Sequence, residues 1–338
     1  MTRIPQLDEA VEYALRAPSV HNAQPWRWRI DTADGVVELY ADRGRRLSAT
    51  DPDGRDLLIS CGAALDHLVV ALAHAGLQAT TLRFPDPENS AHLATVQVSG
   101  TRDAEAACAE LFPAIHRRHT DRRRFSHRPV PSGLIREIID SAARADVVLQ
   151  PVQHAQERFA AVLVDAAARQ RWAPGYPAEL QIWTRRHVGA RDGIPSTAVA
   201  QAPTGLPGPS GLRRFPHADL AQPMPPLGHG LPDDAAAFFV LATAEDRPED
   251  RLRAGEALSR VLLTATRAGL ATTPLSQATE VAASRELLCK VLGIPEQPQL
   301  VLRVGWPATR AAELADTPRR DLASVLIHGQ APMGSRRP

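Results

Sequence analysis

Two stretches of the chain share one pattern: Gly62-Ala63-Ala64-Leu65…Ala75-Gly76-Leu77…Thr80 and Gly255-Glu256-Ala257-Leu258…Ala268-Gly269-Leu270…Thr273. They align at a constant offset without a gap, and Gly, Ala, Leu, Ala, Gly, Leu and Thr coincide. Each stretch predicts an amphipathic helix that ends at a glycine and is followed by a β-rich run, 93–98 or 300–304. The pattern therefore predicts one structural unit repeated in tandem. The alternative is a chance likeness between two helices rich in Gly, Ala and Leu.

The rest of the chain alternates helices with short strands, which predicts an α+β sandwich whose two tandem copies form a pseudo-dimer within one chain. The first half spans residues 1–103 and the second spans 104–338. We predict core helices over 57–75 and 255–268, and further helices over 7–16, 104–117, 131–145, 156–171, 178–187 and 284–292. Strands are predicted over 26–30, 36–40, 93–100, 238–242 and 300–304.

The segment 174–232 differs from the rest in composition. It is dense in proline and glycine, which are poorly suited to regular core structure because proline lacks an N–H donor and glycine is costly to order. A long loop inside a compact unit is usually functional or a linker. We interpret it as a lid over a site; a mobile linker is the alternative.

Charge and composition exclude several classes of function. The 338 residues carry a net charge of +1, which argues against nucleic-acid or membrane partners held by bulk charge. Lys290 is the only lysine, so an anion site has to use guanidinium or backbone N–H groups. Twelve histidines without i,i+4 pairing make a metal site improbable. Walker, G-x-G-x-x-G and G-x-S-x-G motifs are absent.

Targeting signals are also missing from the sequence. The N-terminus has no signal-peptide apolar region, and we expect no run long enough to span a bilayer, which together predict a cytoplasmic protein. The three cysteines, Cys61, Cys108 and Cys289, are widely spaced in apolar contexts. We expect them to be buried, reduced thiols.

Two polar motifs flank the repeated helices, and each occurs once. Pro18-Ser19-Val20-His21-Asn22-Ala23-Gln24-Pro25-Trp26 precedes the first core helix, and Arg118-His119-Thr120-Asp121-Arg122 lies at the start of the second half. Taken alone, the first is a loop with local side-chain hydrogen bonds. The second is a solvated basic loop, a nucleic-acid patch or a phosphate site, in which two guanidinium groups and one hydroxyl hold a dianion.

A third segment, Pro274-Leu275-Ser276-Gln277, follows the second core helix, and taken alone it is an ordinary turn. Together the three motifs resemble those of the nitroreductase family of FMN flavoproteins. The Arg-x-Thr-x-Arg segment is similar to that family's phosphate signature, and the Pro-Ser-x-x-Asn-x-Gln-Pro-Trp segment to its conserved loop. The undivided tandem chain resembles the fused, Acg-type branch.

The resemblance implies a nitroreductase-like fold with one FMN site, built from the loop of the first half and the arginine motif of the second. No partner subunit is required for that site. The residues implied in cofactor binding are Pro18, Ser19, Val20, Asn22, Arg118, Thr120, Arg122, Pro274, Leu275, Ser276, Gln277, Arg319 and Arg320.

The resemblance also implies an activity: hydride transfer from NAD(P)H, through FMN, to a small organic acceptor of the nitro or quinone type. No side chain is implied as a catalytic acid or base, because the flavin carries the chemistry. Arg122 would stabilise negative charge on the reduced ring, and backbone N–H groups at 275–277 would polarise it. The alternative is a non-catalytic protein that stores FMN beneath a lid. A nucleic-acid binder is the weakest hypothesis.

Overall fold

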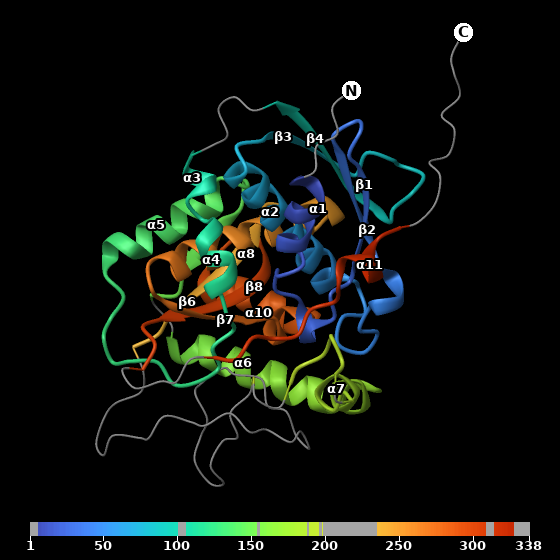
Figure 1. Ribbon diagram of the computed structural model, residues 1–338. Helices are drawn as coiled ribbons and strands as arrows, with labels where there is room; N and C mark the ends of the chain where they lie inside the picture. Colours follow the sequence, from blue (N-terminus) through green and yellow to red (C-terminus); the bar gives the residue numbers. More distant parts are fainter. Residues whose placement is uncertain are drawn as a thin grey trace.

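Two four-stranded antiparallel sheets organise the molecule (Figure 1). The computed structural model describes residues 6–100, 106–153, 156–187, 189–195, 198, 235–308 and 314–327. The first sheet has the order β1-β2-β4-β3, with β1 Trp26–Asp31, β2 Val36–Ala41, β3 Gln78–Arg83 and β4 His92–Gly100. The second has the order β5-β6-β8-β7, with β5 Val148–Pro151, β6 Ala237–Thr243, β7 Ala271–Leu275 and β8 Gln297–Gly305. The two strand orders are equivalent.

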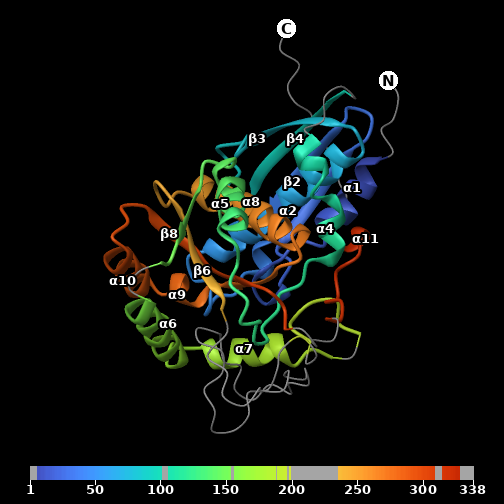
Figure 2. The ribbon, with the colours of Figure 1, turned by 90° about the vertical axis from the view of Figure 1, so that its left-hand side faces the viewer.

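Two long helices, α2 (Arg55–His74) and α8 (Pro248–Arg267), pack against each other between the sheets (Figures 1 and 2). Both have 20 residues. The offset seen in the sequence relates their first residues and also their last. They touch through backbone at Gly62 and Gly255: a Cβ on Gly62 would lie 2.0 Å from the Leu252 carbonyl oxygen, and one on Gly255 2.1 Å from that of Ile59. Only glycine permits this approach.

Each sheet packs its apolar face on one of these helices. In the first half the indoles of Trp26 and Trp28 are fully buried with leucines of α2, and in the second Phe239 and Leu302 are buried with leucines of α8. Smaller elements surround this core: α1 Gln6–Ala14, η1 Val20–Asn22, η2 Arg43–Arg45, α3 Ala106–Ala109, α4 Phe112–Arg117, α5 Ser132–Ala143, α6 Gln156–Arg171, α7 Tyr176–Thr184, α9 Gln277–Glu280, α10 Ala282–Leu292 and α11 Leu322–Val325.

Most predicted elements are confirmed, with three kinds of difference. Strands β3, β5 and β7 were not predicted, because β3 is half exposed, β5 has four residues, and β7 contains Pro274. Proline is tolerated there because β7 is an edge strand. The single helix predicted over 104–117 is α3 and α4, and Pro113, which suits a helix start, lies in the first turn of α4. Helix α8 begins earlier than predicted, at Pro248.

Two predictions concern residues that the structure describes only in part. The boundary at 103/104 falls within 101–105, outside the described residues, and stays a prediction. Of the segment 174–232, the described portion is 174–187, 189–195 and 198; it contains α7. The remainder of that segment lies outside the described residues, so the lid stays a prediction.

The expectation that no apolar run could span a bilayer was wrong in terms of length. Helix α2 is long and apolar enough to cross a membrane by length and composition alone. However, most of this helix is buried inside the fold, where it packs in the core. The cysteine expectation holds for Cys61 and Cys108, which are buried free thiols; Cys289 is a free thiol but partly exposed.

Candidate functional site

Two adjoining cavities lie where the two halves meet. We call them the inner cavity, about 770 Å³, and the arginine cavity, about 570 Å³, both including the open space at their mouths. Four residues line both cavities and so mark where they join: Pro18, Ser19, Thr120 and Arg122. The first two belong to the loop of the first half and the last two to the arginine motif of the second. The cavities together therefore form one elongated site at the junction of the halves.

An extended backbone explains why alternate residues of the arginine motif face this site. The segment runs parallel to β7, with a bridge between Thr120 and Thr272 and a hydrogen bond from Asp121 N–H to the Thr272 carbonyl (2.9 Å). Successive side chains of an extended chain point to opposite sides. Arg118, Thr120 and Arg122 accordingly line the arginine cavity; His119, which lies between them, lines it as well and departs from the alternation.

Asp121, which lies inside the arginine motif, and Arg123, which directly follows it, fix the segment to the protein. Arg123 donates two hydrogen bonds to the Asp121 carboxylate, 2.9 Å from Nε and 2.8 Å from Nη2. The Thr273 hydroxyl donates to the Asp121 carbonyl at 2.6 Å. The Arg303 guanidinium lies 3.6 Å from the ring centroid of Phe125 and donates to the Arg123 carbonyl. The arginine motif and the residue after it are therefore not simply a solvated basic loop, because Asp121 and Arg123 are buried and anchor the segment.

Arg118 and Arg319 bring two positive charges into the wall of the arginine cavity. Arg118 is 7% exposed, and its Nε and Nη1, like the Nε of Arg319, are buried without a hydrogen-bond partner among the described residues. Burial, with repulsion from Arg16, lowers the pKa of Arg118 to about 10. Burial, with repulsion from Arg118 and Arg16, lowers the pKa of Arg319 to about 9.

No carboxylate of the described residues forms an ion pair with either guanidinium. Asp316 is close, but it pairs with Arg16 (3.5 Å) and His119 (3.1 Å) instead. A buried cation without a counter-ion is costly, and the cost is removed when an anion binds. The arginine cavity is thus built for a multiply charged anion such as a phosphate monoester.

The loop of the first half is held in an unusual backbone conformation. His21, Asn22 and Gln24 have φ of +48°, +55° and +51°, in the left-handed region of backbone conformation that residues other than glycine rarely adopt. Two hydrogen bonds hold the loop: Ser60 Oγ on α2 accepts from Val20 N–H (3.3 Å), and within the loop Ser19 Oγ accepts from Gln24 N–H (3.0 Å). Such strain occurs preferentially at functional sites.

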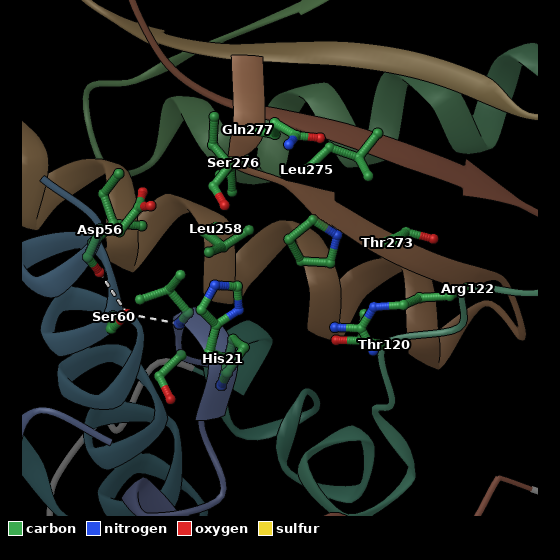
Figure 3. Close-up of a pocket in the computed structure, with 16 residues that line it drawn as sticks. His21, Asp56, Ser60, Thr120, Arg122, Leu258, Thr273, Leu275, Ser276 and Gln277 are labelled. Atoms are coloured by element: carbon green, nitrogen blue, oxygen red, sulfur yellow. Dashed lines mark hydrogen bonds between the residues drawn. The ribbon is translucent and has the colours of Figure 1, made fainter. Parts of the chain in front are cut away.

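The inner cavity is a slot with apolar walls and polar ends. Its apolar walls come from Ile59 of α2, Leu258 of α8, Leu275 of β7 and Leu300 of β8. Figure 3 shows Asp56, Ser60, His21 and Ser276 around one end, and Thr120 and Arg122 at the other. The slot suits a flat apolar group with polar edges.

The turn from β7 into α9 is anchored from behind. The Ser276 hydroxyl donates to Glu280 Oε1 at 2.6 Å, and the Gln277 amide donates to Gln170 Oε1 on α6 at 2.9 Å. Gln170 in turn donates to the other oxygen of Glu280. These bonds order the turn, whose residues Leu275, Ser276 and Gln277 line the inner cavity.

The structure brings together all but one of the residues predicted for the site. Asn22, Arg118 and Arg319 line the arginine cavity, and Arg320 lines neither. Its guanidinium contacts the carbonyls of Gln24 and Ser324 and lies 3.6 Å from Asp42. The inner cavity is lined by Val20, Pro274, Leu275, Ser276 and Gln277, and the four residues that line both cavities complete the predicted set.

Several lining residues were not predicted. His21 carried a signal, because it lies inside the loop motif. Asp56, Ile59 and Ser60 carried none, since their positions depend on how α2 crosses the site. The remaining unpredicted residues are Leu258, Thr273 and Leu300 in the inner cavity, and His119, Ile194, Pro195, Ala198, Leu314, Ala315 and Thr317 in the arginine cavity.

The described residues contain no group of three or more His, Cys, Asp or Glu side chains placed to hold a metal ion. The site instead joins an anion-binding end to an apolar slot. A molecule with a phosphate at one end and a planar ring system at the other fits this arrangement.

Comparisons with known proteins place the chain in a family. The model of the nitroreductase family matches residues 115–306. Two relatives from Mycobacterium tuberculosis H37Rv are named “Putative NAD(P)H nitroreductase”: Rv3131 is 43% identical over 93% of this chain and 88% of its own, and acg is 36% identical over 95% of each.

Among solved structures, the FMN-dependent nitroreductase NfnB from Mycobacterium smegmatis, in complex with NADPH, is 15% identical, with 67% of this chain and 99% of that chain covered and a TM-score of 0.40. That structural likeness is too low to carry an argument. The family match and the two relatives suffice: the chain belongs to the nitroreductase family.

Proposed function

We propose that this protein binds one FMN in the joined cavities and transfers hydride from NAD(P)H, through the flavin, to a small organic acceptor of the nitro or quinone type. One observation carries the proposal: two buried guanidinium groups that no described carboxylate pairs with lie at the end of an apolar slot. The names of the relatives, which refer to NAD(P)H nitroreductases, support it.

The residues present fit FMN. Arg118 and Arg319 would hold its phosphate, and the Thr120 hydroxyl would add a neutral hydrogen bond. The apolar side chains of the slot would contact the ring system, and Ser19, which lines both cavities, would contact the chain between ring and phosphate. Because Arg320 lines neither cavity, we assign it to positioning the loop rather than to the phosphate.

When bound, FMN supplies the hydride-accepting and hydride-donating ring. The protein's contribution is electrostatic. Arg122 lines both cavities, so its guanidinium would stabilise the negative charge that develops on the ring when it is reduced. The anchored turn at 275–277 would direct backbone donors toward the ring. We propose no side chain as a general acid or base.

A two-step measurement tests the proposal. The purified protein is loaded with FMN, freed of excess flavin by gel filtration and mixed with NADH or NADPH in an anaerobic stopped-flow instrument. Bleaching of the flavin absorbance within seconds, followed by recovery on addition of a quinone or nitroaromatic compound, is the expected result. Failure to retain FMN would reject the cofactor, and retention without bleaching would reject the reductase.

The alternative is a protein that stores or withholds FMN. The observation that favours it is that Ile194, Pro195 and Ala198, all from the 174–232 segment, line the arginine cavity. None of the described residues of that segment lines the inner cavity, where a nicotinamide would have to stack. We therefore favour the reductase. Persistent yellow absorbance under excess NADPH would favour storage.

We propose that the two halves arose by duplication, that each chain forms its own flavin site without a partner subunit, and that the protein acts in the cytoplasm on small molecules. The equivalent strand orders and the matched helices α2 and α8 support the duplication. The small net charge supports a role without nucleic acid or membrane partners.

A further inference from the structure

The amide of Asn22 makes three hydrogen bonds, all to protein atoms. Its Nδ2 donates to the Gly193 carbonyl (3.1 Å) and to the Pro318 carbonyl (3.0 Å). Its Oδ1 accepts from Nη1 of Arg319 at 3.1 Å. An amide nitrogen has two hydrogens to donate, so the donors of Asn22 are fully used. Asn22 lines the arginine cavity, yet its side chain is committed to other parts of the chain.

Gln24, two residues later, makes a parallel set of contacts. Its Nε2 donates to the Arg191 carbonyl at 2.7 Å, and its Oε1 accepts from the backbone N–H of Arg320 at 2.8 Å. The two amides thus join three segments that are distant in sequence: the loop 18–24, the segment 189–195 and the C-terminal segment 314–320. Both views of the fold show the last two side by side (Figures 1 and 2).

The segment 189–195 forms part of the arginine cavity through Ile194 and Pro195. It is also held by Asp192, which forms ion pairs with Arg45 and Arg186, and by Ile194 N–H, which donates to the Trp183 carbonyl at 2.8 Å. Arg319, the other partner of Asn22, carries a buried charge toward the same cavity. A single amide therefore contacts both Gly193, which directly precedes the lining residues Ile194 and Pro195, and the cation of the cavity.

We propose that Asn22 and Gln24 are positioning residues that couple anion binding in the arginine cavity to the docking of segment 189–195. An anion on Arg319 fixes that guanidinium, and through it the Asn22 amide that holds the Gly193 carbonyl. Because coupling is reciprocal, docking of the segment strengthens anion binding by the same factor. The inference rests on the anion site of the proposed function, but not on flavin chemistry.

Hydrogen exchange of a peptide covering 189–195, followed by mass spectrometry, reports docking directly. Inorganic phosphate serves as the probe, and its binding is measured separately by calorimetry. In the wild-type protein, saturating phosphate should slow exchange of this peptide about tenfold, as expected from mass action on the docked state. Riboflavin, which lacks the phosphate, should leave the exchange rate unchanged.

The informative variant is Asn22→Gly, because glycine accepts the positive φ of this position and removes only the amide. It should still bind phosphate through Arg118, but exchange of 189–195 should be fast and unaffected by phosphate. Asn89→Gly, which alters an exposed turn, should behave as wild type. If Asn22→Gly does not fold, Asn22→Asp replaces both donors and places a carboxylate on Arg319, and it should weaken phosphate binding and undock the segment together.

Three results would overturn the coupling while leaving the anion site in place. These are phosphate-dependent protection that persists in the folded Asn22 variant, protection of wild type by riboflavin equal to that by phosphate, or phosphate binding to wild type without any change in exchange. A wild-type protein that binds no phosphate would overturn the anion site itself, and the coupling with it.

Discussion

At the scale of single residues, Arg118 shows how binding and stability oppose each other. Its buried charge lowers the stability of the ligand-free protein and attracts the anion. Arg118→Met should therefore raise the free energy of unfolding without ligand, by about 1–3 kcal/mol, and weaken FMN binding by about 2–3 kcal/mol. Urea unfolding and flavin titration measure the two effects.

Arg117→Met is the matched control for this variant. Arg117 is exposed, and among the described residues its guanidinium donates to the Pro113 carbonyl alone. It should change neither quantity by more than about 0.5 kcal/mol. Ser19→Ala should weaken FMN binding by only about 1 kcal/mol, because a neutral hydroxyl contributes less than a charged group. An Arg118 variant that retains full affinity would contradict the assignment of this residue to the phosphate.

Asp51 gives the molecule a pH dependence of stability. It accepts a hydrogen bond from Leu57 N–H in the first turn of α2, and burial, with a smaller effect of the Glu280 carboxylate, raises its pKa from 3.8 to about 6. The native state therefore holds this proton more tightly than the unfolded chain. The contribution to stability is present below pH 4 and is lost as pH rises from about 4 to about 6.

Asp51→Asn keeps an acceptor for the helix but does not titrate. Relative to wild type, its free energy of unfolding should increase by about 1–3 kcal/mol between pH 4 and pH 7. Denaturant unfolding at several pH values measures the difference between the two proteins. A difference that stays constant over this range would show that another group controls the titration.

The sequence could predict the identity of most site residues, because Arg118, Thr120 and Arg122 are spaced for an extended segment and the loop motif is contiguous. It could not show that the Asn22 amide forms its hydrogen bonds with other parts of the protein, or that Arg320 lines neither cavity. Those outcomes depend on where residues 191–193 and 318–320 come to lie, which no local pattern encodes. The same holds for Asp56 and Ser60 of α2.

At the scale of elements, α2 and α8 cross with their backbones in close contact at Gly62 and Gly255. Gly62→Ala and Gly255→Ala would each place a methyl group about 2 Å from a backbone carbonyl oxygen of the other helix. Each should destabilise the protein by about 3 kcal/mol, at the upper end of overpacking penalties, because backbone cannot move aside as a side chain can. Thermal and urea unfolding measure the loss.

Gly133→Ala in α5 is the control, because a Cβ there meets nothing within 4 Å. It should stabilise the helix by about 0.5–1 kcal/mol. Equal effects of all three substitutions would mean that helix propensity, rather than the crossing, governs the response.

Periodicity predicted the long helices because their apolar faces repeat along many residues. The strands β3, β5 and β7 were missed because each is short or an edge strand, and a few residues with one polar face carry little pattern. Edge position is a property of the whole sheet, so Pro274 could not be placed in a strand before the sheet was known.

At the scale of the whole molecule, the two halves are matched in fold but not in chemistry. The constant sequence offset between α2 and α8 also makes Arg83 in the first half equivalent to Ser276, which lines the inner cavity. Arg83 forms two hydrogen bonds of 2.7 Å with Glu256, so the position equivalent to the cavity wall holds an ion pair. We expect saturation at one FMN per chain, measured by absorbance and protein concentration after gel filtration. Two flavins per chain would contradict this.

The meeting of two halves at one pocket has a consequence for how the protein responds to heat or truncation. Neither half forms a complete pocket alone, so a cofactor bound between them would hold the two halves together. Loss of either half would release it, and its retention would report that both are intact. The absorbance of the bound flavin would then report whether both halves of the protein are folded.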